Sequence, residues 1–112
     1  MYSKELTKGT LQPIILKLFG DNERLYGYEL TQKVKALTNG KIDISEGALY
    51  PILHKLEATG ILETEDTYIG KRVRKYYRIT EQGKIAVQKV THEMQDFIAT
   101  LSLLFNKETL EP

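Results

Sequence analysis

Apolar residues recur with a helical period at the start of the chain. After Thr10 they lie at i, i+3, i+4, i+7 and i+8, the stripe of an amphipathic helix: Leu11, Ile14, Ile15, Leu18 and Phe19. Thr10 can cap this helix, and Pro13 falls in its first turn, where a missing N–H is tolerated. The Gly-Asp-Asn-Glu run at 20–23 then predicts a loop.

Two further segments show the same period. The second predicts a helix that begins near Tyr28, buries Leu30, Val34 and Leu37, and stops at the Asn-Gly pair of residues 39–40. The third predicts a helix capped by Ser45, with Leu49, Ile52, Leu53 and Leu56 on its inner face and Gly60 at its end. Pro51 lies beyond the first turn of this third helix, so we expect a kink or a loosened first turn.

The period then changes from helix to strand. Residues 61–68 and 73–79 predict two strands joined at 69–72, a hairpin with a glycine near its turn. Val73, Tyr77 and Ile79 alternate on one face of the second strand, while Arg74 and Arg78 occupy the other face.

A single long helix is expected from Thr80 to about Lys107. Its apolar residues follow spacings of 3 and 4, the seam of a coiled coil: Val87, Val90, Met94, Phe97, Leu101 and Leu104, widened by Ile98 and Phe105. Such a rod is roughly 40 Å long, whereas a domain of this size has a radius of gyration of roughly 13 Å. Docking on the first helix of the same chain explains only the first half of the seam. We therefore expect homodimerisation, with Leu11 and Ile15 of the first helix joining the interface.

The predicted fold class is mainly α with a small β-hairpin. Three helices, a hairpin and a long helix form a winged helix-turn-helix over residues 1–80 and a C-terminal dimerisation helix over 81–112, in one compact unit. The length of 112 residues fits one domain.

Charge is informative only locally. The net charge is +1, which predicts no polyanionic partner, yet residues 71–78 carry five cations and no acid: Lys71, Arg72, Arg74, Lys75 and Arg78. A solvated basic hairpin is one explanation. Neutralisation of DNA phosphates explains better why cations that repel one another gather at one turn.

The third helix offers a matching outer face. Opposite its apolar stripe lie Gly47, Tyr50, Pro51, His54 and Ala58, with Lys55 at the margin. A helix of this width fits the major groove of B-DNA. Tyr50 is expected to point away from the core and contact DNA; the alternative is that it lies on the surface or covers a gap beside the second helix.

Catalysis is not expected. The chain has no cysteine, its only histidines are His54 and His92, and no phosphate loop, carboxylate pair or nucleophile motif accompanies them. We expect no cofactor and no metal. The N-terminus does not read as a signal peptide, and no apolar run exceeds three residues, so a cytoplasmic protein is expected.

Three stretches resemble the PadR-like regulators: residues 27–30 (Gly-Tyr-Glu-Leu), residues 47–62 with their Leu-Tyr-Pro element, and residues 74–83 with Lys-Tyr-Tyr-Arg. The resemblance covers roughly residues 7 to 105 and is closest to the short subfamily with one dimerisation helix. It implies a dimeric transcriptional repressor that a small hydrophobic or aromatic ligand can release from DNA, although the tryptophan that some members use for ligands is missing. It also implies these DNA-contacting residues: Ser45, Gly47, Tyr50, Pro51, His54, Lys55, Lys71, Arg72, Arg74 and Lys75. A winged helix that binds only proteins is the alternative.

Overall fold

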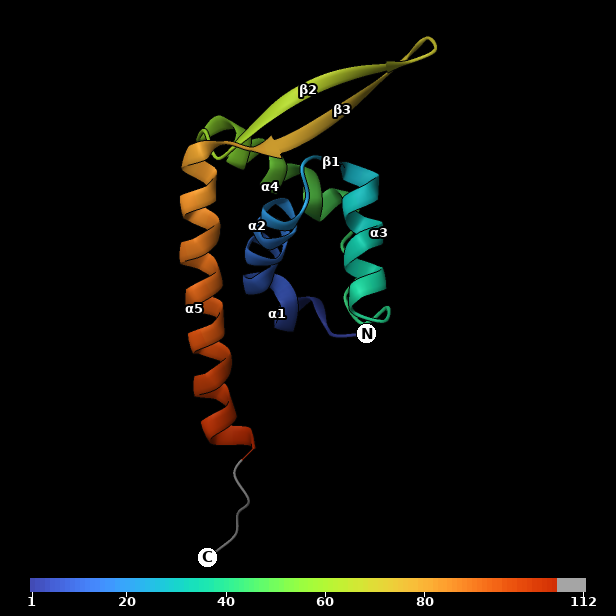
Figure 1. Ribbon diagram of the computed structural model, residues 1–112. Helices are drawn as coiled ribbons and strands as arrows, with labels where there is room; N and C mark the ends of the chain where they lie inside the picture. The colour runs from blue at the N-terminus through green and yellow to red at the C-terminus, as the bar shows by residue number, and fades with distance from the viewer. Residues whose placement is uncertain (107–112) are drawn as a thin grey trace, which may run out of the picture.

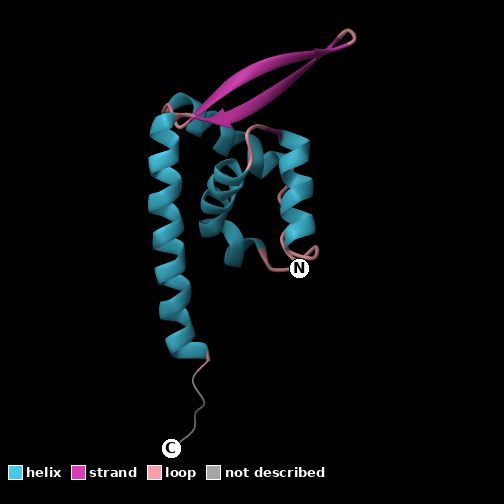
Figure 2. Cartoon of the chain, viewed as in Figure 1, coloured by secondary structure: helices cyan, strands magenta, loops and turns pink. Residues whose placement is uncertain are grey.

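The computed structural model describes residues 1–106. Its elements follow in the order α1 (Lys4–Thr7), the 3-10 turn η1 (Lys8–Thr10), α2 (Leu11–Asp21), β1 (Leu25–Tyr26), α3 (Gly27–Leu37), α4 (Glu46–Ala58), β2 (Leu62–Ile69), β3 (Arg72–Ile79) and α5 (Glu81–Phe105). Figures 1 and 2 show a helical body from which the β2–β3 hairpin projects at one end and α5 at the other. The predicted order of three helices, a hairpin and a long helix is confirmed.

The core lies where α2, α3 and α4 meet the base of the sheet. Its buried apolar residues are Ile15, Leu16, Leu18, Phe19, Leu25, Leu30, Val34, Ile44, Leu49, Leu53, Leu56, Leu62 and Tyr77. These positions come mainly from the helical stripes of the sequence, with one residue from each of the three strands and Ile44 from the segment before α4. Burial of the stripes fixes how each helix is rotated about its axis, and therefore which residues it leaves outside.

The hairpin, called the wing from here on, belongs to a three-stranded antiparallel sheet of order β1-β3-β2. Its turn is the two-residue Gly70-Lys71, since Ile69 pairs with Arg72. Gly70 has φ 63° and Lys71 a negative φ, the glycine-first pattern that suits a two-residue hairpin. The edge strand β1, in which Leu25 pairs with Tyr77, was not predicted because two residues carry no readable alternation.

Several helix boundaries differ from the sequence prediction. Helix α2 runs to Asp21, two residues into the predicted loop; Asp21 forms an ion pair with Lys17 (3.1 Å), and Asn22 donates a side-chain hydrogen bond to the Leu18 carbonyl (2.8 Å). The short α1 was not predicted. Leu37, expected in the core, is 72% exposed because it lies in the last turn of α3, where no other element covers it.

Helix α5 begins as predicted at Thr80. The Thr80 hydroxyl accepts from the N–H of Gly83 (3.0 Å) and donates to the Gly60 carbonyl (2.7 Å), which joins the base of the wing to the helix. Gly83 is buried, and a Cβ there would collide with the Ile61 carbonyl. The helix is described to Phe105, so Lys107 and the rest of the expected 81–112 segment lie outside the described residues.

The apolar seam of α5 divides into two halves. Val87, Val90 and Met94 are half-buried against the body, where Val87 and Val90 pack on the core. Beyond them the seam is exposed: Phe97 50%, Ile98 58%, Leu101 37%, Leu104 70% and Phe105 79%. Over residues 1–106, no helix combines the length and the apolar character that a membrane span requires.

Of the two α2 residues expected at a dimer interface, one is misplaced. Ile15 is fully buried in the core of its own chain, because α2 turns that side toward α3 and α4. It therefore leaves the set of interface candidates. Leu11, one turn earlier, is half-buried at the edge of the body and stays a candidate.

Candidate nucleic-acid interface

Helix α4 presents the polar face that its sequence predicts. Ser45 caps it, because its hydroxyl accepts from the N–H of Ala48 (3.2 Å). Leu49, Leu53 and Leu56 anchor the helix in the core. Five of the six predicted contact residues on this helix are exposed: Ser45, Gly47, Pro51, His54 and Lys55.

Pro51 does not loosen the first turn of α4, contrary to expectation. The N–H groups of Ala48 and Leu49 both reach the Ser45 carbonyl, at 3.1 and 3.0 Å, and the helix continues through Pro51 to Ala58. The carbonyl of Gly47 loses its N–H partner at Pro51 and lies at an exposed residue. An open carbonyl on this face is a further hydrogen-bond acceptor for a ligand.

Tyr50, the sixth residue, lies elsewhere than expected. It is half-buried and packs against the core, with its hydroxyl against Gly27 at the start of α3. The prediction that the ring points away from the core is wrong, and the alternative, that it covers a gap beside the second helix, describes the structure. Its ring remains next to that of His54, with centroids 6.2 Å apart, so it adjoins the exposed face of α4.

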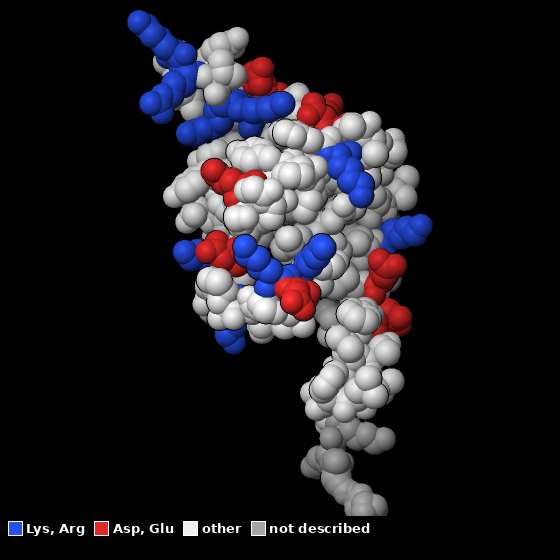
Figure 3. All heavy atoms as spheres, turned by 180° about the vertical axis from the view of Figure 1, so that it is seen from behind, with Lys and Arg blue, Asp and Glu red and all other residues white. Residues whose placement is uncertain are grey.

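The wing carries the predicted cations, but they are not equivalent. Lys71, Arg72 and Lys75 are exposed, and Figure 3 shows the Lys and Arg side chains gathered at the end of the wing. Arg74 is half-buried, with its guanidinium 4.1 Å from the centre of the Tyr26 ring. Lys75 also approaches Glu57 of α4, at 4.0 Å.

A stack of cations and aromatic rings holds the base of the wing to β1. The Arg24 guanidinium lies 3.9 Å from the centre of the Tyr76 ring, and the Tyr26 and Tyr76 rings meet edge to face at 5.4 Å. Glu65 of β2 accepts a 2.7 Å hydrogen bond from Arg24, which raises the pKa of that guanidinium and keeps it charged. Sequence reasoning missed this stack because its members come together only through the β1–β3 pairing.

Comparison with known proteins shows the family of this chain. The model of the "Transcriptional regulator PadR-like family" matches residues 15–89, which include α4 and the whole wing. The chain belongs to the PadR-like family. Its fold, a winged helix with a long C-terminal helix, is the fold of solved family members, and the family consists of transcriptional regulators rather than enzymes.

Individual PadR-like and related proteins agree. A transcriptional regulator of Mycobacterium tuberculosis is 33% identical over 83% of each chain, and an uncharacterized protein of Lysinibacillus sphaericus is 36% identical over 83% of this chain and 85% of its own. The crystal structure of a PadR-like transcriptional regulator from Bacillus cereus, 28% identical, matches with a TM-score of 0.77 over 93% of this chain and 99% of its own. A PadR family regulator from Eggerthella lenta is 32% identical, with a TM-score of 0.74 over 93% and 88%.

Proposed function

We propose that this PadR-like regulator is a homodimeric repressor that binds duplex DNA in a sequence-specific manner. Residues 1–80 read the DNA and the helix from residue 81 joins two copies. The observation that carries the proposal is the pairing of an exposed face on α4, with no acid at its centre, and a cationic wing beside it. The face is formed by Gly47, Pro51, His54 and Lys55.

The dimensions and chemistry of α4 suit the major groove. A helix with side chains is about 10–12 Å wide and the groove about 12 Å. His54 and Lys55 supply hydrogen-bond donors to base edges or phosphates, while Gly47 lets backbone approach closely. The exposed wing cations Lys71 and Arg72 then lie along the phosphate backbone, where they add affinity that depends on salt.

Dimerisation is proposed through the exposed half of the α5 seam. Phe97, Leu101 and Leu104 present apolar side chains to solvent on a helix that has left the body, and a second copy of the same seam would cover them. A two-fold dimer presents two α4 helices to half-sites about one helical turn apart.

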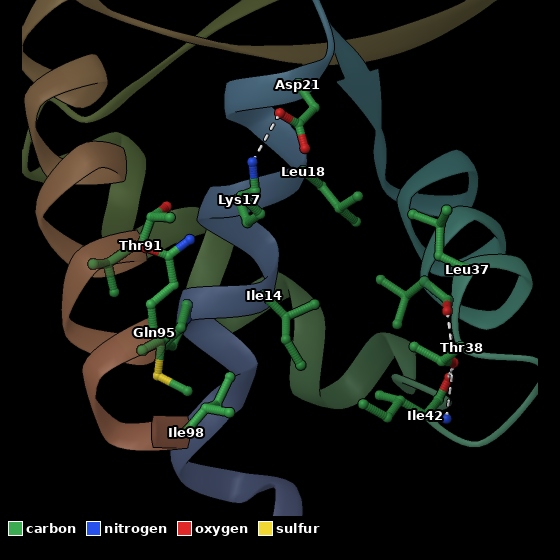
Figure 4. Close-up of a pocket in the computed structure, with 14 residues that line it drawn as sticks. Ile14, Lys17, Leu18, Asp21, Leu37, Thr38, Ile42, Thr91, Gln95 and Ile98 are labelled. Atoms are coloured by element: carbon green, nitrogen blue, oxygen red, sulfur yellow. Dashed lines mark hydrogen bonds and ion pairs between the residues drawn. The ribbon is translucent and has the colours of Figure 1, made fainter. Parts of the chain in front are cut away.

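A small hydrophobic or aromatic ligand is proposed to relieve repression. An apolar groove of about 380 Å³ lies between α2, the end of α3 and α5, lined in part by Ile14, Leu37, Ile42 and Ile98 (Figure 4). Because α5 forms one wall, a ligand there would change the angle between this helix and the body. That angle sets the spacing of the two α4 helices in the dimer.

Binding to DNA separates this function from that of a protein-interaction adaptor. Genomic fragments retained by the purified protein are sequenced, and affinity for the enriched duplex is measured between 50 and 200 mM salt, a range over which several phosphate contacts change affinity by orders of magnitude. Selective binding that weakens steeply with salt, together with lowered expression of a reporter placed behind that duplex, supports a repressor. Absence of duplex binding favours the adaptor.

A further inference from the structure

One hydroxyl inside the molecule has no hydrogen-bond partner. Among the buried side-chain nitrogen and oxygen atoms of residues 1–106, only the hydroxyl oxygen of Thr91 lacks a partner. Thr91 belongs to α5 and lines the apolar groove between α2, the end of α3 and α5 (Figure 4). Buried polar groups are almost always hydrogen-bonded, because a bond to water that nothing replaces costs free energy. An unsatisfied hydroxyl in the wall of a groove therefore indicates a partner from outside the chain.

The threonine on the α3 side of the same groove is satisfied. The Thr38 hydroxyl donates to the Val34 carbonyl (2.8 Å) and accepts from the Ile42 N–H (3.1 Å). Such a bond to the carbonyl four residues earlier is the usual one for a threonine on a helix. Thr91 makes no such bond to the Val87 carbonyl. Its hydroxyl is therefore available to a bound molecule.

The groove offers no counterion to a charged molecule. Among the described residues that line it, only Lys17 and Asp21 of α2 are ionisable, and they pair with each other at 3.1 Å. Both side chains are more than half exposed, so the pair lies at the rim. A charged molecule would lose water in the groove without gaining a counterion, which is strongly unfavourable. The lining therefore suits an uncharged molecule.

The rest of the groove is apolar and large enough for a ring system. Ile14 of α2 lies between Ile42 on the α3 side and Ile98 of α5 (Figure 4). Met94 adds a flexible thioether that adapts to the shape of what it packs against. The volume of about 380 Å³ falls within the range of small-molecule sites, about 300–1,000 Å³.

Gln95 lies beside Thr91, one turn further along α5 (Figure 4). It lines the groove and is exposed, whereas the Thr91 hydroxyl oxygen is closed off from water. An exposed side chain changes rotamer within nanoseconds, so Gln95 can uncover the hydroxyl without a change in the backbone. Its amide also supplies a donor and an acceptor next to the same point.

We propose that the groove binds an uncharged molecule with an apolar body and one hydrogen-bonding group, which bonds to the Thr91 hydroxyl. The body packs against Ile14, Ile42 and Ile98. This inference rests on the proposed relief of repression by a ligand, and it assigns that ligand a chemical class and an anchoring residue. A ketone, an amide or a neutral phenol belongs to the class, whereas a carboxylate or an ammonium does not.

Three probes of equal size test the class: acetylnaphthalene, isopropylnaphthalene and naphthoate, substituted at the same ring position. They carry a carbonyl, no polar atom and a negative charge, respectively. Each is titrated into the full chain while isoleucine methyl signals are followed by NMR. The signals of Ile14, Ile42 and Ile98 should shift, and exposed Ile85 of α5, outside the lining, is the control. Isopropylnaphthalene should bind roughly three- to tenfold more weakly than acetylnaphthalene, and naphthoate should bind most weakly.

Variants of Thr91 test the anchor. Thr91→Val replaces the hydroxyl with a methyl group of the same shape, so acetylnaphthalene should bind only as well as isopropylnaphthalene, whose own affinity should not change. The same variant removes an unsatisfied hydroxyl and should raise the melting temperature by a few degrees. Thr91→Ser keeps the hydroxyl and should keep the preference for acetylnaphthalene. Thr100→Val, at an exposed residue outside the lining, is the matched control and should behave like wild type.

Equal affinity of wild type and Thr91→Val for acetylnaphthalene would overturn the anchor, and tightest binding of naphthoate would overturn the uncharged class. Methyl signals in the groove that respond to none of the probes, and show contacts with a second copy instead, would assign the groove to an interface between copies and contradict the proposal. Release of DNA is measured separately. Acetylnaphthalene that binds as expected but leaves the protein on its enriched duplex would support the anchor and contradict only the proposed relief of repression.

Discussion

The wing and the distal half of α5 both leave the body of the molecule, and their surfaces differ in chemistry: the end of the wing is cationic, whereas the distal helix is apolar (Figures 1 and 3). The end of the wing carries Lys71 and Arg72, and Tyr68 of β2 is also exposed. The distal half of α5 exposes the apolar side chains of Phe97, Leu101 and Leu104. A protruding element buries little of its surface against its own chain, so the chemistry of that surface indicates what kind of partner it would suit. One surface suits a polyanion and the other an apolar partner.

The two elements also differ in how they are anchored. The wing is held at its base by pairing with β1 and by the ring of Tyr76 under Arg24, a polar and aromatic attachment. Helix α5 is held by apolar packing of Val87 and Val90 on the body, and by the Thr80 hydroxyl at its start. The helix continues beyond its apolar attachment with the same seam, and the proposed second copy would cover this exposed part.

The largest effect is expected from a charge on the exposed seam. Phe97→Glu or Leu101→Glu should leave a monomer and lower DNA affinity by about 100-fold or more, because a buried unpaired carboxylate is strongly unfavourable and a monomer loses half of its contacts. Light scattering and a gel-shift titration measure the two results. Ala99→Glu, which adds the same charge to the exposed opposite side of the helix, should stay dimeric. A dimer of normal mass for the seam variants would contradict the proposed interface.

Neutralising the wing should affect DNA binding without affecting dimerisation. Lys71→Ala combined with Arg72→Ala removes four cations from the two wings of the dimer and should reduce the slope of log affinity against log salt by about 3.6, about 0.9 for each phosphate contact. Both side chains are exposed, so thermal stability should not change. Fluorescence anisotropy at a series of salt concentrations measures the slope, and an unchanged slope would show that these cations do not contact DNA.

A smaller effect is expected where the two elements join. Thr80→Val removes the hydroxyl that accepts from Gly83 and donates to the Gly60 carbonyl, and should lower the free energy of unfolding by about 1–2 kcal/mol. Chemical denaturation measures the loss. The same substitution at exposed Thr100 of α5 is the control, and an equal change in both variants would mean that the hydroxyl contributes nothing at the junction.

The smallest effect is expected from Gly27→Ala. The added methyl group overlaps the Tyr50 hydroxyl and the ring carbon that bears it, so the half-buried ring must shift; stability should fall by about 1 kcal/mol while DNA affinity falls several-fold. Tyr50→Phe in the same chain should recover part of the affinity. Gly9→Ala, where an added methyl meets nothing within 4 Å, is the matched control. Wild-type affinity for Gly27→Ala would mean that the position of Tyr50 is unimportant.

The helices of this fold that carry a regular apolar pattern could be predicted from the sequence. The stripes of α2 and α4, the Ser45 and Thr80 caps, and the seam of α5 are local patterns, and each has its physical cause within a few residues. The prediction that Leu37 is buried was wrong because a periodic pattern identifies the inner face of a helix but not where the neighbouring elements end. The prediction that Ile15 lies at a dimer interface was wrong because apolar character alone does not distinguish a core residue from an interface residue.

The candidate interface was only partly predictable for the same reason. Exposure of Gly47, Pro51 and His54 follows from the rotation of α4, which its leucines fix. The position of Tyr50 depends on Gly27, a residue of another helix, and the contacts of Tyr76 with Arg24 and Tyr26 form where β1 pairs with β3. Such contacts between distant segments leave no periodic trace in the chain.

The mass of the protein–DNA complex tests the central claim most directly. Sedimentation equilibrium of the protein with its selected duplex should give two 12.9 kDa chains on one duplex, and two chains in its absence. A single chain bound to the duplex, or a protein that is monomeric and binds no DNA, would contradict the assignment of the apolar rod to a second copy and of the cationic wing to the polyanion.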